Sequence, residues 1–260
     1  MGKWREERIG DCRLILGDCL EVMPTLGGVD HVISDPPYED ELHSAVGKFA
    51  SLRNDGKQYA SNKLDSFRFN GVNAVRADVA KAIVETSEGW AVVFTLAEGV
   101  RAWRDDVQAA GGKYDTCLAW VKPDSAPRFN GQGPARGFEC AVTAWCGKGH
   151  RKWNAGGKRG VYTHLVNGPL RHGEHPTEKP QLLMLELLRD FTSHNQTILD
   201  PFMGSGTTLV ACAKLGRKGI GIELDPDYFE IACRRVEEAY RQPDLFIEPP
   251  KKPEQEAMDL

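Results

Sequence analysis

Apolar residues along this chain gather in short runs that alternate with amphipathic segments. The runs predict strands at residues 12–18, 29–34, 90–95, 114–122, 138–146, 197–200 and 218–223. Apolar residues at helical spacing predict helices from residue 19 and at 73–86, 97–110, 181–193, 207–215 and 227–240. Asp18 can cap the first helix, and Pro180 suits the start of the helix at 181–193. This alternation predicts an α/β fold whose mostly parallel sheet has helices on both faces.

Three segments lack this pattern. Residues 39–72 are polar and weakly periodic, and we expect a long mobile loop with a functional role. Residues 123–174 are rich in Gly, Pro, His and basic residues and are expected to form a small insert. The tail at 241–260 contains few apolar residues, and we expect it to be disordered. We therefore predict one domain over residues 1–240.

Composition excludes several classes of protein. With 260 residues, 41% of them hydrophobic, the chain can bury one large core. It has no apolar run long enough to span a membrane, and its first eleven residues lack the apolar core of a secretory signal. Its seven cysteines form no CxxC pair, and Cys140, Cys146 and His150 match no common zinc spacing. We expect a soluble cytoplasmic protein without a metal site.

A glycine turn between a predicted strand and a predicted helix is the strongest chemical signal. It reads Asp200-Pro201-Phe202-Met203-Gly204-Ser205-Gly206-Thr207. Glycines let a ligand approach the backbone closely. Glu223 ends the next strand, where a carboxylate can bind the hydroxyl groups of a ribose. Leu209 replaces the third glycine of dinucleotide-binding turns, so an ordinary α/β turn and a nicotinamide oxidoreductase are the alternatives at this point.

A second signal follows the predicted strand at 29–34. Ser34 is followed there by Asp35-Pro36-Pro37-Tyr38, which by itself is also a good turn sequence. Ligand crevices form at the carboxyl ends of parallel strands. A carboxylate, a carbonyl fixed by two prolines and an aromatic ring at this place could hold a planar amine. The oxygens would accept its protons and the ring would stack on the base.

Together, the two motifs resemble those of the DNA amino-methyltransferases that use S-adenosylmethionine, the N6-adenine and N4-cytosine family. The catalytic motif precedes the cofactor motif here, as in the β-type, circularly permuted members. The resemblance implies a Rossmann-like methyltransferase fold with a seven-stranded sheet.

Three smaller motifs extend the resemblance over residues 10–240. His175-Pro176-Thr177-Glu178-Lys179-Pro180 matches an HPTxKP element, which implies that Thr177 and Lys179 lie near the methionine end of the cofactor. Gly17-Asp18 matches a motif whose acid lies near the cofactor adenine, and Trp120-Val121-Lys122 matches a WxK strand. The cofactor-binding residues are thus expected to be Asp18, Asp35, Thr177, Lys179, Asp200, Pro201, Phe202, Gly204, Ser205, Gly206, Thr207 and Glu223.

The resembled mechanism is direct transfer without a covalent nucleophile. No Pro-Cys dipeptide occurs, which disfavours methylation at cytosine C5. Asp35 and the Pro36 carbonyl would hold the amine beside Pro37, and Tyr38 would stack on a base flipped out of the duplex. Asp at the first position of the motif favours adenine N6 over cytosine N4 within the family. A cytosine N4, RNA or protein amine methyltransferase and an inactive DNA-binding module are the alternatives.

Charge is distributed unevenly along the chain, whose net charge is −4. Residues 111–181 hold 11 Lys and Arg against 5 Asp and Glu, a net charge of +6, which leaves −10 for the remainder. Contacts with DNA phosphates need local positive charge. We expect target recognition by the insert, with double-stranded DNA bound by Lys122, Arg128, Arg136, Arg151, Lys152, Lys158 and Arg159. A solvated polar insert is the alternative interpretation.

The remaining expectations concern partners. The family resemblance implies a bacterial or phage-type, nucleoid-associated enzyme, often a homodimer and sometimes paired with a restriction endonuclease. Gln242-Pro243-Asp244-Leu245-Phe246 resembles peptides that dock on bacterial sliding clamps. Packing of Leu245 and Phe246 against the last helix is the alternative.

Overall fold

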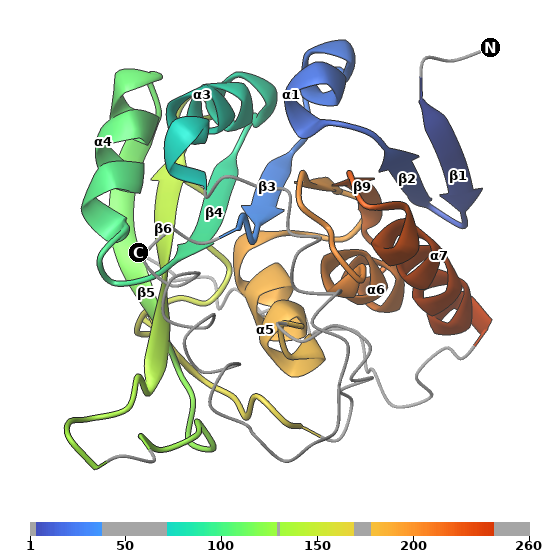
Figure 1. Ribbon diagram of the computed structural model, residues 1–260. Helices are drawn as coiled ribbons and strands as arrows, with labels where there is room; N and C mark the ends of the chain where they lie inside the picture. Colours follow the sequence, from blue (N-terminus) through green and yellow to red (C-terminus); the bar gives the residue numbers. More distant parts are fainter. Residues whose placement is uncertain (1–3, 38–71, 129–130, 169–177, 242–260) are drawn as a thin grey trace, which may run out of the picture.

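A single mixed sheet organises the molecule (Figure 1). The computed structural model describes residues 4–37, 72–128, 131–168 and 178–241. In these residues the sheet has nine strands in the order β1-β2-β9-β8-β3-β4-β6-β5-β7. Their bounds are β1 Arg5–Ile9, β2 Cys12–Leu16, β3 His31–Ser34, β4 Trp90–Thr95, β5 Lys113–Val121, β6 Phe138–Trp145, β7 Val161–Thr163, β8 Thr197–Asp200 and β9 Lys218–Glu223.

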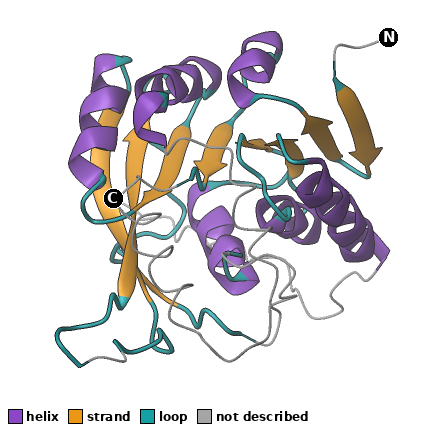
Figure 2. Ribbon diagram, viewed as in Figure 1, coloured by secondary structure: helices purple, strands orange, loops and turns teal. Residues whose placement is uncertain are grey.

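Helices cover both faces of this sheet (Figures 1 and 2). On one face lie α1 (Cys19–Val22), α3 (Arg76–Thr86) and α4 (Val100–Ala109), packed over a core that includes Ile83 and Trp103. On the other lie α5 (Gln181–Phe191), α6 (Thr207–Leu215) and α7 (Pro226–Arg241), over a core that includes Leu188. Short 3-10 turns at Met23–Thr25 and Val72–Ala74 adjoin α1 and α3.

The strand directions bring several chain segments to one edge of the sheet. Strands β2, β9, β8, β3 and β4 pair in parallel, so all five end at the same edge, which we call the carboxyl edge. Strand β6 runs antiparallel to β4 and β5, and it begins at this edge, with Cys140 beside Thr95 and Phe138 beside Val121. The end of β5 therefore lies at the carboxyl edge as well.

The expected mostly parallel sheet is confirmed, and its strand count is nine instead of seven. The two strands that hydrophobic patterning missed are edge strands, β1 and β7. Strand β1 is mostly charged, and Glu6 on it forms an ion pair with Arg13 of β2 (2.9 Å). Strand β7 has only three residues, two of them exposed. Strands of this kind bury too little apolar surface to leave a period-2 pattern.

Helix boundaries differ from the expected ones by a few residues. The helix expected from 73 is a 3-10 turn followed by α3, because Val75 leaves the helical region at φ −121° and ψ 0°. The helix expected near 97 begins after Gly99, and the one expected to reach 193 ends before the extended Thr192. Asp18 caps α1 as expected, accepting a 2.8 Å hydrogen bond from the Leu20 amide.

The predicted insert is only partly separate from the sheet. Strand β6, which falls within 123–174, lies between β4 and β5. The loops at 123–137, 146–160 and 164–168 are its irregular parts, and residues 129, 130 and 169–174 lie outside the described residues. The expectations for 39–71 and for the tail from 242 also fall outside the described residues. No helix of the described chain has the length and apolarity to cross a membrane.

Candidate active site

Acidic residues follow four parallel strands at the carboxyl edge. Asp35 comes directly after β3, Asp200 ends β8 and Glu223 ends β9. Asp18 follows β2, where the Gly17 amide donates to the Glu223 carbonyl over 2.8 Å. The sheet thus brings together acids that are far apart in sequence.

Asp35 is held by Lys179. The Nζ atom of Lys179 donates to Oδ2 of Asp35 over 2.6 Å, which joins the end of β3 to the segment that precedes α5. Pro36 and Pro37 follow Asp35 and lead the chain away from the sheet. The structure therefore pairs two residues that the sequence placed in separate motifs.

Lys179 is buried and has a second acidic partner. Its side chain is 7% exposed, and its Nζ lies 3.3 Å from Oε2 of Glu139 at the start of β6. Glu139 also forms an ion pair with Lys122, which follows β5. Burial lowers the pKa of the Lys179 ammonium, but Asp35 and Glu139 outweigh this effect and raise the pKa overall. Lys179 is therefore a cation under neutral conditions.

The glycine turn joins β8 to α6 closely. The Met203 amide donates to the Ile222 carbonyl over 3.0 Å, which ties the turn to β9. Gly204 and Gly206 have φ of +51° and +81°, values that favour glycine. A Cβ at Gly206 would also meet the Ala232 Cβ at 3.0 Å. The backbone conformation thus favours glycine at both positions, and the close packing of α7 adds a second reason at Gly206.

Asp200 lies beneath this turn with neutral hydrogen-bond donors. Its Oδ2 accepts from the Thr208 hydroxyl over 2.5 Å, and its Oδ1 accepts from the Phe202 amide over 3.1 Å. Burial raises the pKa of this carboxyl to about 7, and the nearby Asp35 and Glu223 add to the rise. Pro201 is buried and Phe202 half-buried beside it. A cationic ligand at this place would favour the ionised form of Asp200.

Glu223 receives backbone amides on both carboxylate oxygens. Oε2 accepts from Gly204 over 2.9 Å, and Oε1 accepts from Leu224 and Asp225 over 2.9 and 2.8 Å. Burial nevertheless raises the pKa of the Glu223 carboxyl, against these hydrogen bonds. A carboxylate offers about four lone-pair positions. Glu223 therefore has acceptor capacity for a ligand hydroxyl beyond its three backbone contacts.

A buried ion pair that the sequence analysis missed supports the turn from behind. Arg235 of α7 donates to Ser205, over 2.7 Å to the carbonyl and 2.6 Å to Oγ, and contacts Thr207 Oγ1 at 3.3 Å. Its other terminal nitrogen pairs with Oε1 of Glu178 at 2.5 Å, and both side chains are under 5% exposed. This pair connects the turn to the residue next to Lys179. The position of Glu178 inside the HPTxKP element was the available signal.

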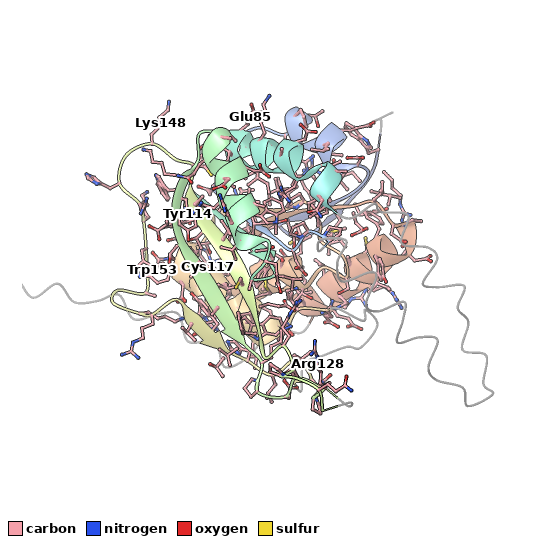
Figure 3. All side chains as sticks on the ribbon, turned by 60° about the vertical axis from the view of Figure 1, so that its left-hand side comes forward. Glu85, Tyr114, Cys117, Arg128, Lys148 and Trp153 are labelled. Carbon is pink, nitrogen blue, oxygen red and sulfur yellow. The ribbon has the colours of Figure 1, made fainter. Side chains whose placement is uncertain are left out.

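The structure separates the residues predicted to bind DNA. Arg128 and Arg136 lie in the loop after β5, on the side of the carboxyl edge, and Arg136 pairs with Glu98 at 3.1 Å. Figure 3 shows Arg128 at the opposite end of β5 and β6 from Lys148.

Arg151 and Lys152 lie toward the other edge of the sheet. Arg151 pairs with Asp115 near the start of β5, and the Lys152 carbonyl accepts from the indole of Trp90 at the start of β4. Arg159 is exposed just before β7.

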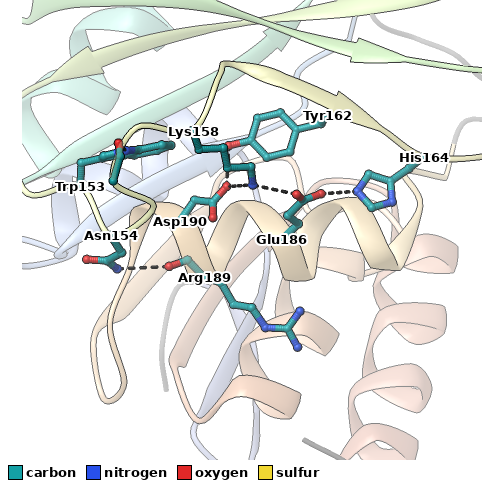
Figure 4. Close-up of polar contacts among 9 residues, drawn as sticks. Trp153, Asn154, Lys158, Tyr162, His164, Glu186, Arg189 and Asp190 are labelled. Carbon is teal, nitrogen blue, oxygen red and sulfur yellow. Dashed lines mark hydrogen bonds and ion pairs between the residues drawn. The ribbon is translucent and has the colours of Figure 1, made fainter. Parts of the chain in front are cut away.

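Two further predicted DNA contacts are partners of carboxylates inside the fold. Lys122 pairs with Glu139, as described above. Lys158 pairs with Glu186 (2.7 Å) and with Asp190, both on α5 (Figure 4). Neither ammonium is placed as a phosphate contact in this structure.

Some predicted site residues lie outside the described chain, namely Tyr38, Thr177 and the segment 242–246. Within the described residues, no group of three or more His, Cys, Asp or Glu side chains is arranged to hold a metal ion.

Comparison with known proteins identifies the family. A family model described as DNA methylase matches residues 29–234. The protein YubD of Escherichia coli (strain K12) is 32% identical over 229 residues, which cover 86% of this chain and 89% of YubD. The type II methyltransferase M.HinfI of Haemophilus influenzae is 25% identical over an alignment of 283 positions, covering 92% of this chain and 74% of that protein.

Solved structures of DNA methyltransferases have a similar fold. The crystal structure of the M1.HpyAVI–SAM complex superposes with a TM-score of 0.65 at 25% identity, over 86% of this chain and 98% of that one. The PvuII DNA methyltransferase, described as cytosine-N4-specific, shares the fold with a TM-score of 0.64 at 16% identity, over 90% of this chain and 92% of that one. The acids and the glycine turn at the carboxyl edge therefore lie in a chain that belongs to the DNA methylase family.

Proposed function

We propose that this protein transfers the methyl group of S-adenosylmethionine to the exocyclic amino group of a base in double-stranded DNA, with adenine N6 as the acceptor. The proposal is supported by the position of five groups at one edge of the sheet. These are Asp35, Lys179, the glycine turn, Asp200 and Glu223.

The residues at this edge fit the cofactor. Glu223 can accept from ribose hydroxyls, and the turn at Gly204–Thr207 lets a ligand approach the backbone. Burial raises the pKa values of Asp200 and Glu223, nearby carboxylates add to the rise, and a sulfonium ligand close to them would favour their ionised forms. Asp18 and Lys179 complete the proposed cofactor contacts within the described chain. When bound, S-adenosylmethionine supplies an electrophilic methyl group.

Asp35 is proposed to act on the acceptor amine. Its carboxylate accepts a hydrogen bond from the amino group, and the Pro36 carbonyl takes a second one. These contacts align the amine and stabilise the positive charge that develops on its nitrogen, so positioning and electrostatics supply most of the acceleration. Lys179 holds the carboxylate in its orientation over 2.6 Å. The preference for adenine rests on Asp35 at the first position of the motif.

The proposed DNA face is the carboxyl edge with the loop that carries Arg128 and Arg136. Both side chains are exposed, and the loop follows β5 on the side of Asp35. Because the acceptor amine lies inside the duplex, the base has to be flipped out toward Asp35.

The product of the reaction tests this proposal. The protein is incubated with methyl-labelled S-adenosylmethionine and duplex DNA, and the DNA is digested to nucleosides and separated. Label in N6-methyldeoxyadenosine is the expected result. Label in N4-methyldeoxycytidine would overturn the adenine assignment alone, and DNA without label would overturn the proposed function.

A further inference from the structure

Four charged side chains of alternating sign form a row at the carboxyl edge, in the order Lys122, Glu139, Lys179 and Asp35. They come from four places in the chain and are 14%, 10%, 7% and 27% exposed. Each of the two inner members, Glu139 and Lys179, contacts two opposite charges. The row is thus a linear arrangement in which no two like charges are neighbours.

Glu139 is the member that keeps the two ammonium groups apart. Both lysines lie over the ring of Trp120, with Lys122 Nζ at 4.4 Å and Lys179 Nζ at 5.9 Å from its centroid. Without the Glu139 carboxylate, the buried Lys179 and the half-buried Lys122 would share one aromatic ring, and among their described ion pairs that of Lys179 with Asp35 would remain. Burial penalises an ammonium that lacks sufficient opposite charge. Lys179 would then lose its proton or turn away from Asp35.

We propose that Glu139 is a positioning residue for methyl transfer, which keeps Lys179 charged and directed at Asp35. This inference rests on the proposed function, because it concerns the carboxylate that holds the acceptor amine. The sequence motifs do not include Glu139. Its proposed role in positioning Lys179 is inferred from the contacts of β6 with the segment before α5.

The charged groups around Lys179 determine the pH at which its ammonium loses its proton. Asp35 faces it from the end of β3 and Glu139 from β6, while Lys122 lies beyond Glu139 and Asp200 lies near Asp35. Loss of the Glu139 charge removes one of the two carboxylates that raise the pKa of Lys179, so this pKa falls below its wild-type value. The ammonium then deprotonates at lower pH, and Asp35 loses its partner there.

Steady-state transfer measured between pH 6 and pH 10 tests the proposal. Wild type should keep Lys179 charged over this range, because the pKa of its ammonium is raised above that of an ordinary lysine. Glu139→Gln should bring an alkaline limb of the kcat profile into the range and reduce kcat above that limb by up to about 100-fold, the cost of a misplaced catalytic group. Glu139→Asp, which keeps the charge, should restore the wild-type profile. Asp106→Asn, which removes a carboxylate from the 2.7 Å ion pair with Arg76 between α3 and α4, is the matched control and should leave the profile unchanged.

NMR titration of the Lys179 side chain provides a readout that does not depend on catalysis. Its pKa should fall in Glu139→Gln and stay at the wild-type value in Asp106→Asn. A wild-type pH profile of kcat together with a wild-type Lys179 titration in Glu139→Gln would overturn the inference. Absence of transfer by the wild-type protein would instead contradict the proposed function, and the titration would still decide whether Glu139 controls Lys179.

Discussion

Two lysines in this molecule each lie between two carboxylates. The acids near one lysine belong to the proposed binding site, and those near the other form a structural contact. Lys179 joins Asp35 to Glu139 at the carboxyl edge. Lys158 joins two acids of helix α5 (Figure 4). Both ammonium groups have a raised pKa, because their carboxylate partners outweigh the effect of burial. The lysines alone would not distinguish the two regions.

The acids around Lys158 are compensated within the fold. Glu186 and Asp190 are one helical turn apart on α5, and Tyr162 donates to Asp190 over 2.8 Å while His164 lies 2.5 Å from Glu186. Burial would raise the pKa of Glu186, but hydrogen bonds from Lys158 and His164 lower it overall. These contacts fasten the segment around β7 to α5, so we interpret the cluster as structural.

Two acids of the carboxyl edge, Asp200 and Glu223, show the opposite pKa shift. Asp200 and Glu223 end separate strands and accept hydrogen bonds only from neutral donors among their described contacts. Burial raises the pKa of both. Negative charge that the fold leaves without a cation is costly unless a ligand supplies one. A raised acid pKa at a strand end therefore indicates binding more directly than a lysine with two partners.

The largest expected effect concerns the compensated pair at the carboxyl edge, Arg235 and Glu178. Arg235→Met should destabilise the protein by about 3–5 kcal/mol, because it leaves Glu178 as a buried charge without its cation. Urea unfolding measures this loss. Cofactor binding, measured by calorimetry, should weaken as Ser205 and Thr207 lose their donor. The double variant with Glu178→Gln should recover part of the stability but not the cofactor affinity. An equal free energy of unfolding for Arg235→Met and wild type would show that Arg235 does not support the glycine turn.

A comparable but pH-dependent effect is expected for Asp200→Asn. In the unfolded chain Asp ionises near pH 4, while the folded Asp200 retains its proton up to about pH 7. Its contribution to stability is fully present below the unfolded pKa and is lost as the pH rises through 7. Relative to the amide variant, wild type should lose about 1.4 kcal/mol per pH unit across this window. Parallel stability curves for the two proteins from pH 4 to 8 would rule out the raised pKa.

Asp190→Asn tests the structural cluster. It should cost about 1–3 kcal/mol of stability, because Lys158 loses one charged partner and keeps Glu186. Transfer activity well below the melting temperature should equal that of wild type. A large fall in kcat at a temperature where the variant remains folded would show that the cluster on α5 takes part in catalysis.

The smallest effect is expected in DNA affinity. Replacing Arg128 and Arg136 with Ala should reduce the slope of log K against log salt by about 0.9 for each DNA phosphate that the variant no longer neutralises. The pair Arg151→Ala and Lys152→Ala, toward the other edge of the sheet, is the matched control and should leave the slope nearly unchanged. A larger change of the slope in the control variant would show that DNA does not bind at the carboxyl edge.

Much of this picture could be predicted from the sequence, because buried elements leave strong patterns. The runs at 90–95 and 197–200 became β4 and β8 at the predicted residues, and the glycine turn opens α6 as expected. Edge strands such as β1 were missed because they lack a buried face. The role of Glu139 was missed for another reason: only sheet pairing places the start of β6 beside Lys179.

The charge of the insert was a weaker guide. The net charge of 111–181 predicted seven DNA contacts, but local charge does not show which cations already have partners. Lys122 and Lys158 bind carboxylates in the fold, and Arg151 lies toward the far edge beside Asp115. Such partners come from distant parts of the chain and carry no local signal.

The proposed role of Asp35 in methyl transfer can be tested by comparing two isosteric variants. The single-turnover rate of methyl transfer to DNA is measured for Asp35→Asn and Asp190→Asn, both saturated with S-adenosylmethionine. Each variant removes one carboxylate beside a lysine. We expect Asp35→Asn to bind the cofactor but to transfer its methyl group at least about 100-fold more slowly, since the amide no longer stabilises the charge that develops on the amine. Asp190→Asn should transfer at the wild-type rate. Equal rates in the two variants would contradict the proposed role of Asp35.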